Sequence, residues 1–170
     1  MIVALAARPV RDPAIEVLLR QLHQAFDQRS WHGTNLLGSL RGLDPDVVAW
    51  RPQPGRHNIA ELAVHAAYWK YRVFRLLTDA PPRSFELPGS DFFERARVPT
   101  AAEWQSDVEL LQQWHRRLAA AVEALPRERL AEIPGRGRFT CSELIGGAAA
   151  HDLYHAGQIQ LIKRLYANRG

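Results

Sequence analysis

The amino-acid sequence predicts an all-α protein, a bundle of four main helices. Apolar residues recur every three or four positions in four long segments, and clusters of proline and glycine separate these segments. No segment alternates apolar and polar residues over a length typical of strands. A chain of 170 residues that is 46% hydrophobic can bury one sizeable core but is short for two domains. We therefore expect one domain over residues 1–170, with residues 1–12 as an N-terminal tail.

The first helix is expected to begin at Asp12-Pro13, because a capping side chain is followed there by proline at the first helical position. Its apolar face comprises Ile15, Leu18, Leu19, Leu22 and Phe26. We expect a break at residues 30–33, after which a helical segment resumes over 35–43. Residues 42–56 hold three prolines and two glycines and predict a loop with one short turn at 47–50.

The second helix is expected to run from Asn58 to about Asp79. Asn58 and Glu61 have the spacing of a capping box, and the two prolines that follow Asp79 cannot continue the helix. Its predicted inward face comprises Leu62, His65, Trp69, Val73 and Leu76. The connection over residues 80–99 contains four prolines and three phenylalanines, and connections of this length are frequently functional. We expect it to cover a pocket.

The third and fourth helices each begin with a capping box. Thr100 with Glu103 marks the first of these starts and Thr140 with Glu143 the second, and a turn at residues 134–137 separates the helices. The inward face of the third helix comprises Trp104, Val108, Leu111, His115, Leu118, Val122 and Leu125. That of the fourth comprises Leu144, Ala148, His151, His155, Gln158, Ile162 and Leu165. Tryptophans 69, 104 and 114 are expected in the core or at an interface.

Three histidines occupy apolar faces of predicted helices. His151 and His155 are four residues apart, so both imidazoles leave the same face of the fourth helix. His65 lies on the core face of the second helix. An imidazole buried without a partner costs about 1 to 3 kcal/mol, and one divalent metal ion would satisfy all three. We predict His65, His151 and His155 as ligands of such an ion, with an open position for an acidic water or a substrate thiolate.

Other polar residues near these positions have weaker assignments. Gln158 could satisfy a ring nitrogen or donate to a bound ligand, and Asp152 is either a hydrogen-bond partner of an imidazole or a surface charge. His115 is expected to pack in the core or to support the site from behind. No carboxylate is identified as a general base, because Glu61 and Glu143 have the positions of helix caps. A histidine cluster that serves only packing stays open as an alternative.

The composition indicates which binding partners and which cellular compartment to expect. The formal net charge is +4, yet arginines are spread through every segment among acidic residues, so we expect a solvated surface and no nucleic-acid partner. The single Cys141 excludes an internal disulfide and a cysteine-built zinc site, which favours the cytoplasm. Residues 1–10 are interrupted by charge and proline, so we expect neither a signal peptide nor a membrane partner.

Several motifs then carry a family resemblance: Trp31-His32-Gly33, Arg51-Pro52, Pro54-Gly55, Ile59-Ala60-Glu61-Leu62 leading to His65, Glu103-Trp104, and His151-Asp152-Leu153-Tyr154-His155-Ala156-Gly157-Gln158-Ile159. In these motifs the chain resembles the DinB-like superfamily over about residues 14–166. The resemblance implies an up-down-down-up four-helix bundle, a metal site at His65, His151 and His155, and frequent homodimers. The ion of the family is variously nickel, zinc or iron.

The resemblance also suggests a reaction. The superfamily includes thiol-dependent S-transferases, a mycothiol-dependent isomerase, and members described only as metal-dependent hydrolases or damage-inducible proteins. We expect a cytoplasmic metal-dependent transferase that activates a low-molecular-weight thiol for attack on a small-molecule substrate. Arg83, Arg95 and Arg136, in the long loops, are candidates for steering an anionic ligand. The alternatives are a hydrolase that uses a metal-bound water and a non-catalytic, stress-related helical bundle.

Overall fold

The computed structural model describes residues 12–81 and 85–169. The predicted tail therefore lies outside the described residues except for Asp12, and Arg83 also lies outside them. The helical segments are α1 (Pro13–Phe26), α2 (Leu36–Ser39), α3 (Pro45–Ala49), α4 (Ile59–Thr78), α5 (Ala101–Glu123), the 3-10 helix η1 (Arg127–Ala131) and α6 (Cys141–Ala167). The described residues contain no strand, so the prediction of an all-α protein is confirmed.

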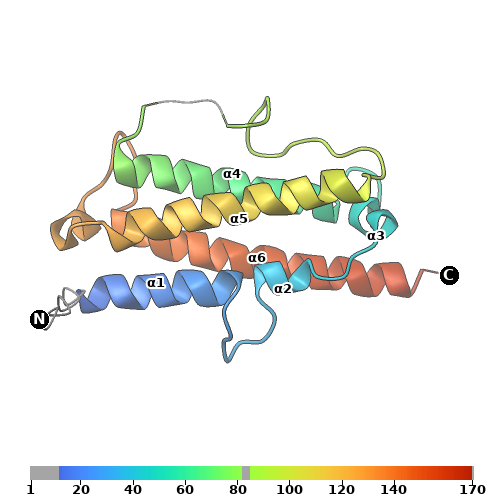
Figure 1. Ribbon diagram of the computed structural model, residues 1–170, viewed down its shortest axis with the longest axis horizontal. Helices are drawn as coiled ribbons and strands as arrows, with labels where there is room; N and C mark the ends of the chain where they lie inside the picture. The colour runs from blue at the N-terminus through green and yellow to red at the C-terminus, as the bar shows by residue number, and fades with distance from the viewer. Residues whose placement is uncertain (1–11, 82–84, 170) are drawn as a thin grey trace, which may run out of the picture.

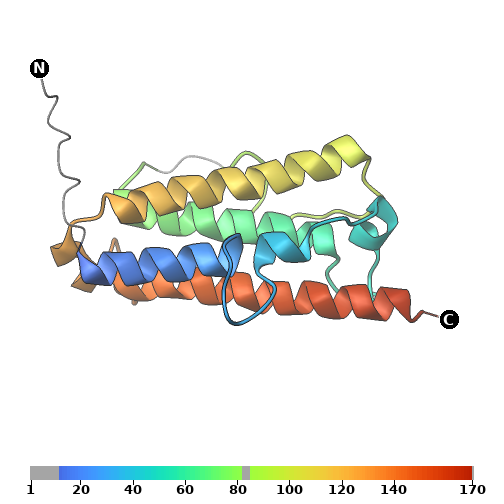
Figure 2. The same ribbon diagram turned by 60° about the horizontal axis from the view of Figure 1, so that its bottom comes forward.

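The four long helices α1, α4, α5 and α6 lie side by side along one axis (Figures 1 and 2). α1 and α6 run in one direction, and α4 and α5 run in the other (Figure 1). This is the up-down-down-up order that the family resemblance implies. Because α4 and α5 are parallel, the chain must return along the bundle between them, and the long connection after α4 does so.

Side-chain caps fix the starts of three of the long helices. The Asp12 carboxylate accepts a hydrogen bond from the backbone N–H of residue 14 at 2.9 Å, with proline at the first position of α1. Complete capping boxes begin α5, with Thr100 and Glu103, and α6, with Thr140 and Glu143. These three starts confirm the sequence prediction.

The start of α4 differs from the predicted capping box. Asn58 accepts a hydrogen bond from the Glu61 backbone N–H at 2.9 Å, but the Glu61 side chain turns to Arg51, to His57 and to the backbone N–H of Arg95. Although burial alone would raise the pKa of Glu61, these hydrogen bonds hold that pKa at about 2. Glu61 thus ties two loops to the first turn of α4, one turn before His65.

The short connections depart from the sequence prediction in detail. α2 covers only residues 36–39 of the expected segment 35–43, and α3 begins two residues before the expected turn at 47–50. η1 was not predicted. A segment of four or five residues is too short to show a helical period, so its local sequence does not mark it.

The core consists of two apolar clusters. One is built around the first half of α4 and the aromatic residues of the long connection, and the other joins α1 to the second half of α4, the end of α5 and the start of α6. Along α5 and α6, the positions between the clusters hold His115 and Asp152. Asp152 accepts a hydrogen bond from Lys70 Nζ at 2.5 Å, and each of these two residues is 1% exposed. A polar layer therefore crosses the middle of the bundle.

Two residues of the predicted inward faces are exposed. Trp69 is 40% exposed and does not pack in the core as predicted. Its indole N–H donates to the Asp91 carboxylate at 2.9 Å. Leu165 is 43% exposed on the last turns of α6. Helical spacing gives the direction of a side chain but not the presence of a neighbour to cover it. In the part of the chain that the structure describes, no helix has the length and apolar character to cross a membrane.

Candidate metal centre

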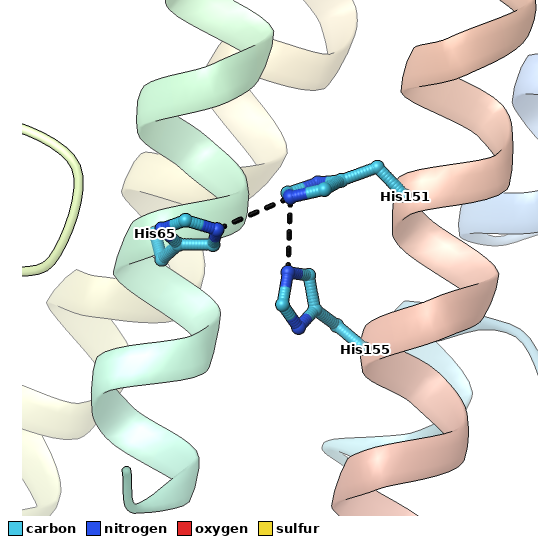
Figure 3. A group of neighbouring side chains, drawn as sticks. All are labelled: His65, His151 and His155. Atoms are coloured by element: carbon cyan, nitrogen blue, oxygen red, sulfur yellow. Dashed lines mark hydrogen bonds between the residues drawn. The ribbon is translucent and has the colours of Figure 1, made fainter.

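Three imidazoles converge between α4 and α6. Figure 3 shows His65 on α4 pointing toward His151 and His155 on the facing helix. The Nε2 atom of His151 lies 3.1 Å from Nε2 of His65 and 3.0 Å from Nε2 of His155. The structure thus brings together the three residues that the sequence predicts as ligands, and the group could hold a metal ion.

Hydrogen bonds at the far side of two rings fix their protonation. His65 Nδ1 lies 2.9 Å from the backbone oxygen of Asp91, and His155 Nδ1 lies 2.7 Å from Oε1 of Gln158. Both oxygens accept, so both Nδ1 atoms carry the hydrogen in a neutral ring, and both Nε2 atoms present a lone pair. Ring N–H donation to a carbonyl oxygen is typical of metal-binding histidines.

The remaining ring, His151, cannot satisfy both neighbours. Its Nε2 atom carries at most one hydrogen and can donate to only one of the two bare nitrogens. The other contact, at 3.0 or 3.1 Å, then has no hydrogen between its two nitrogens. Two nitrogens bound to one ion at 2.0 to 2.1 Å are separated by about 2.9 to 3.4 Å at ordinary coordination angles. The spacing and the donor set therefore fit a divalent ion.

Burial keeps these rings neutral. Desolvation lowers the pKa of His151 to about 3 and that of His155 to about 4, the latter in spite of the hydrogen bond to Gln158, which raises it, and burial also lowers the pKa of His65. A histidine must be unprotonated to bind a metal ion. At neutral pH the group is therefore in the state that binding requires.

We expect the metal-free protein to lose stability as the pH falls below about 6.5. Burial lowers the pKa of His115 to about 2, that of His151 to about 3 and that of His155 to about 4, whereas unfolded histidine titrates near 6.5. In this window the unfolded state binds more protons. The free energy of unfolding then falls by at most about 1.4 kcal/mol per pH unit for each histidine.

Urea unfolding with a chelator from pH 7.5 to 5 measures this slope. His32 is exposed, so the His32→Gln variant should keep the wild-type slope. His115→Phe, which removes one buried imidazole, should reduce it. A wild-type stability that stays constant down to pH 5 would contradict the assignment of neutral buried histidines.

The three histidines lie at one wall of a cavity of about 870 Å³. Its apolar lining includes Trp50, Leu62, Phe92, Leu161 and Ile162. The Phe92 ring stacks on His65 at a centroid distance of 3.9 Å, so the long connection contributes this side chain to the cavity lining. The guanidinium-bearing residues Arg56 and Arg169 also line the cavity. The cavity therefore combines apolar walls with positive charge beside a possible metal site.

The residues predicted to support the site lie in different places. Gln158 contacts His155, as described above. Asp152 is buried and paired with Lys70, so the interpretation as a surface charge is wrong, and no hydrogen bond joins it to an imidazole in the described structure. His115 is 2% exposed and lies in a separate cluster. The structure does not bring Asp152 or His115 to the converging nitrogens.

Of the loop arginines predicted from the sequence, the two that the structure describes do not line the cavity. Arg95 pairs with Asp107 at 3.0 Å, and Arg136 lies exposed in the turn before α6. Arg56 and Arg169 line the cavity instead and were missed, because only the packing of a loop and of the end of α6 brings them there. The sequence analysis also missed Asp91 as the hydrogen-bond partner of His65. Its backbone has a left-handed φ of 63°, a conformation that aspartate adopts more often than most residues.

An all-α bundle with three neutral imidazoles, two buried and one half-buried, meeting between two of its helices defines a class of helical proteins able to hold a metal ion in the bundle core. The model of the DinB superfamily matches residues 11–159, and the chain belongs to this family. No curated protein and no solved structure matches the chain. The family supports the fold and a metal-binding role, and it leaves the reaction to be argued from the site.

Proposed function

We propose that the protein is a metal-dependent transferase that activates a low-molecular-weight thiol for attack on an electrophilic small molecule. His65, His151 and His155 would hold one divalent ion. The observation that carries this proposal is the meeting of three Nε2 atoms, two of them bare, at the wall of a cavity large enough for a small molecule. When bound, the ion supplies positive charge that favours the thiolate form of a thiol.

The residues of the chain would position the reactants. The apolar wall that includes Trp50 and Phe92 excludes water from the reacting atoms, and Arg56 and Arg169 offer hydrogen bonds to anionic groups of the thiol or the substrate. In the reaction the thiol gives its proton to solvent and its sulfur forms a bond with the electrophilic carbon. The leaving group departs with its bonding electron pair.

One feature of the cavity suits a thiol as the nucleophile. Among the described residues that line it there is no aspartate or glutamate, and His57, hydrogen-bonded to Glu61, is the histidine of the lining outside the three predicted ligands. Hydrolysis by an activated water usually relies on a nearby general base, a part that His57 would have to fill. A thiol is ionised more easily than water and needs no such base at neutral pH.

A thiol screen with a model electrophile tests the proposal. Metal-loaded protein is mixed with 1-chloro-2,4-dinitrobenzene and, in turn, cysteine, glutathione and coenzyme A, and thioether formation is followed by absorbance. We expect a rate above that of His65→Ala with at least one thiol, and His32→Ala, altered at an exposed histidine, should match wild type. Equal rates for wild type and His65→Ala with every thiol would refute thiol transfer.

A further inference from the structure

A second group of metal-ligating side chains lies where α1 ends against α5. His23 is in the last turn of α1, Asp27 follows that helix, and His115 lies in the middle of α5. His23 Nδ1 lies 3.1 Å from His115 Nε2, and the ligand atoms of all three residues lie within 4.8 Å of one another. The sequence analysis placed His115 in the core or behind the first site, and the function proposed above uses none of these residues.

This group repeats the arrangement of the three-histidine group. In each group, two ligand residues lie four positions apart: His151 and His155 on one face of α6, and His23 and Asp27 at the end of α1. A histidine from a facing helix completes each set. The separation of 3.1 Å between His23 and His115 equals that between His65 and His151. Two imidazoles and one carboxylate are a donor set that divalent transition metals accept.

Burial and nearby charges set the protonation of these ligands and the access of an ion to them. Desolvation lowers the pKa of His115 to about 2, helped by the positive charge of Lys70, so the ring is neutral and can act as a ligand. Lys70 is itself paired with Asp152 at 2.5 Å, which reduces its repulsion of an ion. Asp27 is exposed and supplies a negative charge on the solvent side. An ion can therefore enter from solvent.

Packing holds the buried ligand in place. The His115 ring stacks on Phe26 at a centroid distance of 3.9 Å, which restricts its rotation. His115 Nδ1, however, has no hydrogen-bond partner, whereas Nδ1 of His65 and of His155 each has one. A ligand histidine without such a partner binds a metal ion less tightly. The group should thus have a lower affinity than the three histidines.

We propose that His23, Asp27 and His115 form a second site for a divalent transition-metal ion. This site is separate from the one at His65, His151 and His155, and it does not depend on the reaction proposed for that one. It has a mixed nitrogen and oxygen donor set and faces solvent on one side.

Titration of the metal-free, untagged chain with Co²⁺, followed by calorimetry and by visible absorbance, tests the second site. We expect two ions per chain for wild type, one for His65→Ala, and one for both His23→Ala and Asp27→Ala. The double variant His65→Ala/Asp27→Ala should bind none. Because Asp27 is exposed, its variant should keep the wild-type melting temperature in a chelator, which shows that a lost ion is not a lost fold.

Two results would overturn the second site. One is a wild-type capacity of a single ion that disappears in His65→Ala. The other is a capacity of two ions that neither His23→Ala nor Asp27→Ala reduces.

Discussion

Replacing Lys70 by methionine is expected to lower the free energy of unfolding by about 3 to 5 kcal/mol, because the change leaves the Asp152 carboxylate buried without its partner. Both residues are 1% exposed, and Oδ1 of Asp152 already lacks a hydrogen-bond partner. Burial raises the pKa of Asp152 even in the presence of Lys70. Urea unfolding of the metal-free protein at neutral pH measures the loss.

The double variant Lys70→Met/Asp152→Leu is the matched control. It removes both charges, and replacing a buried ion pair by apolar residues of similar volume is often neutral or stabilising. We therefore expect it to regain most of the stability that Lys70→Met loses. If the double variant is as unstable as the single one, the loss comes from packing around Lys70 and not from an uncompensated charge.

Zinc is expected to raise the melting temperature of the protein through the three-histidine site. An ion at 1,000 times its dissociation constant adds about 4 kcal/mol to the free energy of unfolding when it binds only the folded state. For a chain of this size, that corresponds to a rise of roughly 8 to 16 °C. The measurement is made in the Asp27→Ala background, so that the second proposed site does not contribute.

His151→Ala in the same background is the comparison. His151 contacts both other imidazoles, so its loss should abolish the rise in melting temperature. The same rise in both proteins would show that zinc stabilises the fold from another position.

The sequence was sufficient for the features that depend on local chemistry. Capping boxes at Thr100 and Thr140 and prolines after α4 mark helix ends within a few residues, and helical spacing identifies the faces that pack. His65, His151 and His155 were identifiable because histidine is unusual on an apolar face, and a bundle brings such faces together.

The features that were missed depend on contacts between distant segments. Lys70 reads as an ordinary helix residue, and only the facing position of Asp152, 82 residues later, makes it a buried ion pair. His23 and His115 meet across 92 residues of sequence. Arg56 reaches the cavity through the packing of a loop that has no periodic pattern. Helical spacing contains no information on these pairings.

Metal content per chain is the most direct test of the three-histidine site. Elemental analysis is made on protein purified without a polyhistidine tag, as wild type and as His65→Ala, His151→Ala and His155→Ala. We expect wild type to contain about one metal ion per chain more than each variant, and the analysis identifies that ion. Equal metal content in wild type and the three variants would contradict the assignment of these histidines as ligands.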